Sequence, residues 1–510
     1  MIVKTFGCAI YGIDAIPVTI EVNIDKGIKF YLVGLPDNAV KESHQRIEAA
    51  LQNTGFSFPR RKVTVNMAPA DIRKEGSSYD LPIAIGILAG SGQMSCEKLA
   101  DYVIMGELSL DGGLNPVKGV LPIAIKAKQE GFKGIILPES NAREAAVVQG
   151  LDVIGLRDLT SVVGFLNGTL QVAPTQAGDD YSDENIFYGC DFSDVKGQEN
   201  IKRALEIAAA GAHNVILIGP PGSGKTMLAK RLPTILPPLT LAEALETTKI
   251  HSVAGLIGAD SSLIRTRPFR SPHHTISDAG LVGGGTYPQP GEISLAHNGV
   301  LFLDELPEFK RQVLEVMRQP MEDRVVTISR AKISVDFPAN FMLVAAMNPC
   351  PCGYYNHPDK ECTCKPGDVQ RYLNKVSGPL MDRIDLHVEV VPVAYSDLSS
   401  RGSGESSAVV RERVLKARHI QEERFADTPG VYANAQMGTQ LLQKYCAIDD
   451  VCSRLLKNAM EKLGLSARAY DRILKVSRTI ADLDGSDVIR PDHVAEAINY
   501  RSLDRDNWGL

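Results

Sequence analysis

The sequence lacks the long apolar run that a membrane-spanning helix requires. Its longest apolar stretch, residues 81–90, is far shorter than the roughly 18 residues of a spanning segment. The first residues also lack the basic region followed by an apolar region that is typical of a secretory signal peptide. Hydrophobic residues make up 44% and charged residues 23% of the 510 residues, as in soluble globular proteins. We therefore expect a folded cytoplasmic protein.

An excess of positive charge and a disulfide framework are also absent. The formal net charge of −6 excludes a globally basic nucleic-acid coat, but it leaves room for a local basic element that contacts phosphates. The nine cysteines are an odd number, and the sequence has no export signal. A disulfide framework is therefore not expected, and closely spaced cysteine pairs favour a metal site instead.

Two polar, aperiodic segments divide the chain, and we predict linkers over residues 171–186 and 396–407. Residues 1–170 mix strand-like and helical patterns, which predicts an α+β or α/β domain. Residues 187–395 alternate strands and helices, which predicts a mainly parallel sheet with helices on both faces. Residues 408–510 contain only helical patterns, which predicts a small helical bundle.

A phosphate-binding loop follows the apolar strand predicted at residues 214–218. Its sequence fits G-x-x-x-x-G-K-[ST] and opens a predicted helix. Glycines allow backbone N–H groups to surround phosphate oxygens, and the helix N-terminus adds positive potential. Lys225 would reach the outer phosphates, and Thr226 would hold Mg²⁺. The predicted ATP-binding residues of this loop are Gly219, Pro220, Pro221, Gly222, Ser223, Gly224, Lys225 and Thr226.

Polar side chains follow two further predicted strands, at residues 300–303 and 341–347. Asp304 and Glu305 come directly after the first, at the strand end where open α/β sheets bind ligands. Asp304 would orient Mg²⁺ through water, and Glu305 would act as the general base on the attacking water. Asn348 ends the second strand and would hydrogen-bond the water or the γ-phosphate. A turn-forming asparagine is the alternative.

An arginine precedes the last predicted strand of this segment. In a ring of subunits Arg383 would reach a neighbour's γ-phosphate, and such an arginine finger raises the rate about 10³–10⁵-fold. An ordinary ion pair with Asp382 or Asp385 is the alternative, and the residues alone leave both interpretations open.

Four cysteines form two C-x-C pairs separated by nine residues. Four thiolates on a short loop satisfy a tetrahedral Zn²⁺ ion, which would order a segment too polar to pack by itself. Reduced thiols without a metal are the alternative, and His357 between the pairs is a substitute ligand. The predicted zinc ligands are Cys350, Cys352, Cys362 and Cys364.

Two basic segments are candidates for DNA contact. Residues 325–337 contain two β-rich arms around a basic tip, which predicts a hairpin with Arg330 and Lys332 at its end. Their contacts would be to phosphates and without sequence preference. The insert at residues 265–290 begins with a basic run that includes Arg267 and Arg270. For the hairpin, the alternative is an exposed hairpin that its charges keep soluble. For the insert, the alternative is an active-site lid or an intersubunit contact.

Several segments together resemble one family. The stretches DFSDVKGQ (191–198), RPFRSPHH (267–274), MNPCPCG (347–353) and SGPLMDRIDLHVEV (377–390) are similar to magnesium-chelatase-like AAA+ proteins of the YifB/ComM group. The resemblance covers nearly the whole chain. It implies an AAA+ αβα core with a C-terminal helical lid, and a homohexamer that hydrolyses ATP with Mg²⁺ between subunits. In ComM-type members it also implies branch migration of DNA during recombination of incoming DNA, with recombination proteins as further partners.

The same resemblance implies roles for individual residues. Val195, Gly197 and Gln198 would line the adenine pocket. Arg468 occupies the position of the sensor-2 arginine in the lid, with Arg472, one helical turn later, as the fallback. Ordinary exposed helix arginines are the alternative for both. The hairpin at residues 325–337 would be the pre-sensor-1 hairpin, which points into the pore of related ring helicases.

The N-terminal segment resembles a different fold. The stretches GELSLDGGLNPV (106–117) and GFKGIILP (131–138) look like the Lon-type protease domain, an S5-domain-2-like α+β fold. Ser78 lies near the nucleophile position, but the lysine position falls at Leu121, which cannot act as a base. Lys118 and Lys126 are nearby in the sequence, so a displaced dyad stays open. We expect a non-proteolytic domain.

Three functions follow from these observations. The first is an ATP-driven DNA translocase or branch-migration helicase. The second is a chelatase-type motor that remodels a protein partner, since the AAA+ core does not by itself reveal its substrate. An ATP-dependent protease ranks last.

Overall fold

The computed structural model describes residues 2–176, 189–258, 261–285, 287–330, 333–355, 357, 359–392 and 404–501. The chain divides into two compact units. The first comprises residues 1–185, 241–264 and 329–337, and the second comprises residues 186–240, 265–328 and 338–510. Most of both predicted linkers and Lys332 lie outside the described residues. The three-part division of the chain therefore stays a prediction.

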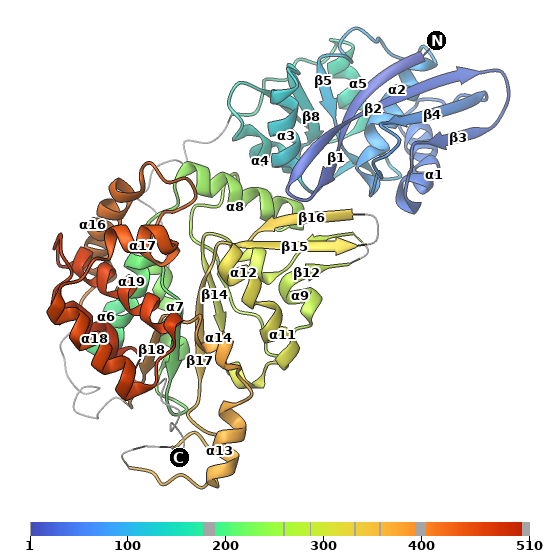
Figure 1. The fold of residues 1–510 in the computed structure, drawn as a ribbon. Helices are drawn as coiled ribbons and strands as arrows, with labels where there is room; N and C mark the ends of the chain where they lie inside the picture. The colour runs from blue at the N-terminus through green and yellow to red at the C-terminus, as the bar shows by residue number, and fades with distance from the viewer. Residues whose placement is uncertain are drawn as a thin grey trace. The chain divides into compact units, whose positions relative to one another are not determined.

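The first unit is built on a seven-stranded mixed sheet (Figure 1). Its order is β3-β4-β2-β1-β5-β8-β9, with β1–β2 and β2–β4 antiparallel and the other neighbours parallel. The strands are β1 (Ile2–Tyr11), β2 (Asp14–Asp25), β3 (Phe30–Val33), β4 (Lys62–Ala68), β5 (Tyr102–Ile104), β8 (Gly134–Pro138) and β9 (Asp152–Leu156). A separate hairpin is formed by β6 (Glu107–Leu108) and β7 (Leu114–Asn115).

The longest apolar stretch of the sequence forms helix α2 (Asp80–Gly90), which packs against β1 and β2. Every residue from Asp80 to Ala89 is buried. A Cβ atom at Gly86 would lie 2.6 Å from Cγ2 of Val22, so glycine allows the helix to approach the sheet this closely. The stretch is thus a core helix. Among the described residues, no helix combines the length and the apolar character needed to cross a membrane.

The described residues of the first unit form five further α-helices, and α3 packs against both β2 and α8. They are α1 (Asn38–Asn53), α3 (Val120–Gln129), α4 (Ala142–Ala146), α5 (Leu159–Leu166) and α8 (Leu241–Ala254).

The second unit contains a five-stranded sheet in the order β11-β14-β17-β10-β18, and every neighbouring pair is parallel. The strands are β10 (Val215–Ile218), β11 (Phe269–Arg270), β14 (Val300–Leu303), β17 (Met342–Met347) and β18 (Leu386–Glu389). All residues of β10, β14 and β17 are buried, as expected for parallel strands covered on both faces. Helix α6 (Glu199–Gly211) packs against β18, and α7 (Lys225–Arg231) packs against β17.

In the described range 404–501, five helices form a bundle on α6 (Figure 1). Helices α16 and α19 contact α6, and α20 packs against α18 and α19. Their apolar side chains join the same hydrophobic core as the parallel sheet. The helices are α16 (Ser407–Phe425), α17 (Thr439–Tyr445), α18 (Asp450–Leu463), α19 (Ala467–Leu483) and α20 (Pro491–Asn499).

Short elements connect the strands of the parallel sheet. A hairpin of β15 (Val325–Arg330) and β16 (Ile333–Pro338) lies between β14 and β17 in the chain. The other connecting elements are α9 (Asp278–Val282), β12 (Gly283–Gly284), β13 (Gln289–Pro290), α10 (Glu292–Leu295), α11 (Arg311–Val316), α12 (Arg318–Asp323), α13 (Pro366–Leu373) and α14 (Gly378–Met381).

Candidate nucleotide-hydrolysis site

The predicted phosphate loop, the two carboxylates and Asn348 lie at one edge of the parallel sheet. Strand β17 runs between β10 and β14, with Ile218 opposite Met347 and Leu303 opposite Ala345. Because the three strands are parallel, the residues that follow them emerge at the same carboxyl edge. The tertiary structure thus brings together side chains that are up to 123 positions apart in the sequence.

Lys225 is buried at the start of α7 and is fully engaged by neighbours. Its Nζ atom donates to the carbonyl oxygens of Gly219 at 2.8 Å and Pro220 at 2.9 Å, and to Oδ1 of Asn348 at 3.2 Å. Burial lowers the pKa of this ammonium group, and the charge of Asp304 opposes that shift. Neutral oxygens therefore surround the cation in a pocket where phosphate oxygens would be stronger acceptors.

Thr226 and Asp304 form the pair expected of a magnesium site. The Thr226 hydroxyl donates to Oδ2 of Asp304 at 2.6 Å, while Oδ1 of Asp304 accepts from the backbone N–H of Glu305 at 2.9 Å. Hydroxyl and carboxylate oxygens are the ligands that Mg²⁺ accepts, often through its own water molecules. These two residues fit an ion that bridges the protein and a triphosphate.

Glu305 extends from the sheet edge in a left-handed backbone conformation, with φ of 53°. Its side chain is 59% exposed, and its Oε2 atom lies 3.1 Å from Nδ1 of His274. The exposed carboxylate is therefore accessible to water while one of its oxygens is held by the imidazole. His274 is a site residue that the sequence analysis placed only in a basic insert. Its place shortly after β11, next to β14, is the signal that could have identified it.

One of the predicted adenine-pocket residues, Gln198, contacts the phosphate loop. Gln198 has φ of 58°, and its Nε2 atom donates to the carbonyl oxygens of Ser223 at 3.0 Å and Val391 at 3.3 Å. Gly197 also has a positive φ, and Val195 is 1% exposed. The Gln198 side chain thus ties the segment before α6 to the loop.

Arg383 is buried and paired within its own chain. Its Nη2 atom lies 2.7 Å from Oε1 of Glu322, and its Nη1 atom donates to the carbonyl oxygen of Pro379 at 2.7 Å. Neither Asp382 nor Asp385 is the partner that these contacts give it. An arginine finger made by this residue would have to exchange Glu322 for a phosphate of the next subunit.

The two lid arginines have different surroundings. Arg468 is exposed near the start of α19. Arg472 is largely buried, and its Nη1 atom lies 2.8 Å from Oδ1 of the buried Asp385. Burial raises the pKa of Asp385, but the charge of Arg472, the His213 ring 3.5 Å away and the backbone N–H of Asn214 together hold it well below its usual range. Arg472 therefore has a structural partner, and Arg468 stays the predicted sensor-2 residue.

The predicted DNA contacts of the 265–290 insert are engaged inside the second unit. Arg267 donates to the carbonyl oxygens of Pro237, Pro238 and Asn298. Arg270 forms a bidentate pair with Glu292, with both N–O distances at 2.6 Å. These contacts favour a structural role for both arginines, and their contact with DNA stays a prediction.

The predicted basic hairpin is present. Arg330 is exposed at the end of β15, and Ser329 and Ser334 face each other across the two strands with their hydroxyl oxygens 3.0 Å apart. Lys332 lies outside the described residues. The pairing of the two strands thus places Arg330 at the turn end of the hairpin.

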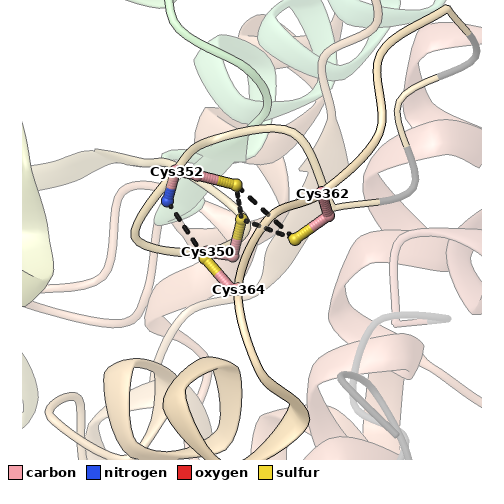
Figure 2. Close-up of side chains that lie close together, drawn as sticks. All are labelled: Cys350, Cys352, Cys362 and Cys364. Carbon is pink, nitrogen blue, oxygen red and sulfur yellow. Dashed lines mark hydrogen bonds between the residues drawn. The ribbon is translucent and has the colours of Figure 1, made fainter.

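The four clustered cysteines converge on one point (Figure 2). The Sγ atoms of Cys350, Cys352 and Cys362 are 3.3 to 3.7 Å apart, and Sγ of Cys364 accepts from the backbone N–H of Cys352 at 3.4 Å. His357 instead accepts hydrogen bonds from the backbone of residues 359 and 360. All nine cysteines of the chain are free thiols.

The position expected for a Lon-type lysine holds a buried leucine. Leu121 is 0% exposed, and its backbone N–H donates to Glu144. The backbone carbonyl of Ser78 accepts from Gly106. Within the described part of the chain, no hydrogen bond joins the Ser78 hydroxyl to a lysine, as a Ser/Lys dyad would require.

The strand order of the parallel sheet, the phosphate loop, the adjacent carboxylates and the helical bundle together define an AAA+ αβα core with a helical lid. Residues 191–398 match the family described as magnesium chelatase, subunit ChlI. Residues 20–141 match subunit ChlI of Mg-chelatase, and residues 404–501 match the C-terminal part of subunit ChlI.

Similar proteins extend this result to nearly the full chain. The competence protein ComM of Haemophilus influenzae is 47% identical over 503 residues, which cover 97% of this chain and 96% of that protein. The uncharacterized protein YifB of Escherichia coli is 45% identical over 502 residues, which cover 98% of this chain and 96% of that protein. Lon protease 2 of Bacillus subtilis is 30% identical over 187 residues, which cover 31% of this chain and 33% of that protein. The chain belongs to the YifB/ComM group of magnesium-chelatase-like AAA+ proteins.

Proposed function

We propose that the chain is an ATP-hydrolysing hexameric motor that acts on DNA, as a branch-migration helicase or translocase in the recombination of incoming DNA. The observation that carries the proposal is the convergence of Lys225, Thr226, Asp304 and Glu305 at one sheet edge. The similarity to a competence protein over nearly the full length supports the choice of DNA as the substrate.

The residues at the sheet edge suit a direct attack of water on the γ-phosphorus. Lys225 would exchange its carbonyl partners for the β- and γ-phosphate oxygens. Thr226 and Asp304 would hold Mg²⁺, which would supply positive charge next to the phosphate oxygens. Glu305 takes a proton from the water as its oxygen bonds to phosphorus. The bond from the γ-phosphorus to the bridging oxygen breaks, and ADP leaves with that electron pair.

In a ring, Arg383 of one subunit would stabilise the charge on the γ-phosphate bound by the next. Its present pair with Glu322 holds the guanidinium within its own chain. The pair would then act as the resting state of the finger, which exchanges one anionic partner for another when a triphosphate is present.

The hairpin of β15 and β16 is the proposed DNA contact. We expect a four-way DNA junction to increase ATP turnover several-fold, and the double variant Arg330→Ala/Lys332→Ala to lose most of that increase. Phosphate contacts by exposed cations are electrostatic, so the stimulation of wild-type protein is also expected to fall as the salt concentration rises. Phosphate release with and without the junction measures both effects.

The matched control is Lys416→Ala/Lys457→Ala, which removes two exposed cations of the lid helices. This control is expected to keep the stimulation. Equal turnover of wild-type protein with every form of DNA would contradict the DNA assignment. It would favour a motor that remodels a protein partner, because the AAA+ core does not by itself reveal its substrate.

We further propose that the four clustered cysteines bind one Zn²⁺ ion. Zinc–sulfur bonds of about 2.3 Å in a tetrahedral site place the sulfurs about 3.8 Å apart. The three measured sulfur separations of 3.3, 3.5 and 3.7 Å fit that spacing with small adjustments. The cysteines thus present a compact set of soft ligands.

Purified protein is expected to contain about one zinc ion per chain, and Cys362→Ser/Cys364→Ser to contain almost none. Cys96→Ser, at an exposed cysteine of the other unit, serves as the control and should keep the metal. Atomic emission spectroscopy on protein that has passed a desalting column gives the metal content. Equal zinc in both variants would show that the metal lies elsewhere.

A further inference from the structure

The turn that follows the first cysteine pair packs directly on the phosphate loop. Gly353 has φ of 84°, a conformation that favours glycine. A Cβ atom at Gly353 would lie 2.5 Å from Cδ and 3.2 Å from Cγ of Pro221, within the phosphate loop. The backbone of residues 348–365, called the cysteine segment below, therefore touches the pyrrolidine ring of Pro221 and leaves no room for a methyl group.

The same segment meets the loop at two further points. Asn348, two positions before Cys350, accepts from the Lys225 ammonium at 3.2 Å. Pro349, Tyr355 and His357 line a cleft together with Gly219 and Pro220, the residues whose carbonyls also accept from Lys225. The phosphate loop is thus bordered by the cysteine segment at several separate points.

The segment has little apolar packing of its own to keep it in place. Cys350 is buried, but most described residues from Cys352 to Lys365 are half-buried or exposed. A metal bound to four thiolates would join Cys350 and Cys352, which immediately precede the phosphate-loop contact, to Cys362 and Cys364, ten or more positions later. Such a cross-link supplies order that burial of side chains does not.

We propose that Gly353 and the metal-bound cysteines position the phosphate loop, so that zinc occupancy sets the affinity of the site for the phosphates of ATP. The inference rests on the proposed ATPase function, because the loop is taken to be the nucleotide site. Gly353 acts through Pro221 and is a positioning residue. Loss of the metal and a methyl group at Gly353 are two independent ways to displace the same loop.

The test measures zinc content and the dissociation constant for N-methylanthraniloyl-ATP, by fluorescence titration without turnover. Cys362→Ser/Cys364→Ser is expected to lose zinc and to bind the nucleotide about tenfold more weakly, the loss of affinity that corresponds to about one hydrogen bond to the phosphates. Gly353→Ala is expected to keep zinc and to show a similar loss. Gly430→Ala is the control, because Gly430 has φ of 79° but no atom within 4 Å of the position that its Cβ would take.

A double-variant cycle separates the contact with Pro221 from strain in the backbone of Gly353. In a Pro221→Ala background the ring atoms that the methyl group would meet are gone, so Gly353→Ala is expected to weaken binding much less there. A full tenfold loss in that background would place the effect in the backbone and overturn the role of the contact.

Unchanged nucleotide affinity in zinc-free protein would overturn the inference and leave the ATPase proposal intact. If the cysteine variant does not fold, zinc is removed from wild-type protein with a chelator and then restored, and the affinity is expected to fall and recover in step. Wild-type protein that binds zinc but no nucleotide would instead contradict the proposed function itself.

Discussion

Glu305→Gln is expected to lower the ATP turnover number about 10²–10⁴-fold, the range by which a positioned general base accelerates a reaction. The amide keeps the shape of the side chain and can still contact His274, but it cannot accept a proton from water. The affinity for ATP is expected to stay unchanged, because Lys225 and Thr226 remain in place. Phosphate release and nucleotide titration on the same preparation separate the two effects.

Glu308→Gln is the matched control for this variant. Glu308 lies three positions later, is exposed, and forms an ion pair with Lys375 on the surface. Exposed pairs of this kind contribute little, so its turnover should equal that of the wild type. Normal turnover of Glu305→Gln would assign the proton acceptor to another group at the sheet edge.

Arg472→Ala is expected to lower the free energy of unfolding by about 3–5 kcal/mol, because it leaves the buried Asp385 carboxylate without its charged partner. Arg468→Ala changes an exposed residue one helical turn earlier, and its stability should stay within about 0.5 kcal/mol of the wild type. Urea unfolding of both variants measures the difference. As the predicted sensor-2 arginine, Arg468 would contact the nucleotide, so Arg468→Ala is expected to raise the KM for ATP while its stability stays unchanged.

The pH dependence of stability provides a second check on Asp385. The pKa of Asp385 in the folded protein is depressed. Its contribution to the free energy of unfolding is therefore fully present above the pKa of an unfolded aspartate, about 4. The contribution is lost only as the pH falls from there towards the lower pKa of the folded state. Equal stability of Arg472→Ala and wild type at pH 7 would contradict a buried ion pair.

Local sequence patterns were sufficient to predict a strand, a glycine-rich loop and a helix at the candidate nucleotide site. The strand at residues 215–218, the loop that follows it and the helix from Lys225 are consecutive, so their geometry follows from glycine conformations and the helix N-terminus. The carboxylates at 304 and 305 were predicted in the same way, from an apolar strand that ends in acidic residues. The lid helices at 450–463 and 467–483 agree with their periodicity.

Local sequence patterns did not predict which residues are the partners of the buried arginines. Arg383 forms an ion pair with Glu322, although acidic residues lie one and two positions away from it in the sequence. Asp385, one of those acidic residues, forms its ion pair with Arg472. The predicted alternative of an Arg383 pair with Asp382 or Asp385 is therefore wrong in its partner. The insert arginines Arg267 and Arg270 likewise have partners 22 to 31 positions away.

The sequence by itself determined the family and predicts a phosphate-binding loop, because the conformation of such a loop depends on a short run of consecutive residues. Only the tertiary structure decided which groups surround those residues. Parallel strands bring Asn348 into hydrogen-bond contact with Lys225, and His274 into contact with the carboxylate of Glu305. The fold of the second unit packs Gly353 against Pro221. The physical reason is that these contacts join segments whose order in space is chosen by burial of the whole sheet, not by their neighbours in the chain.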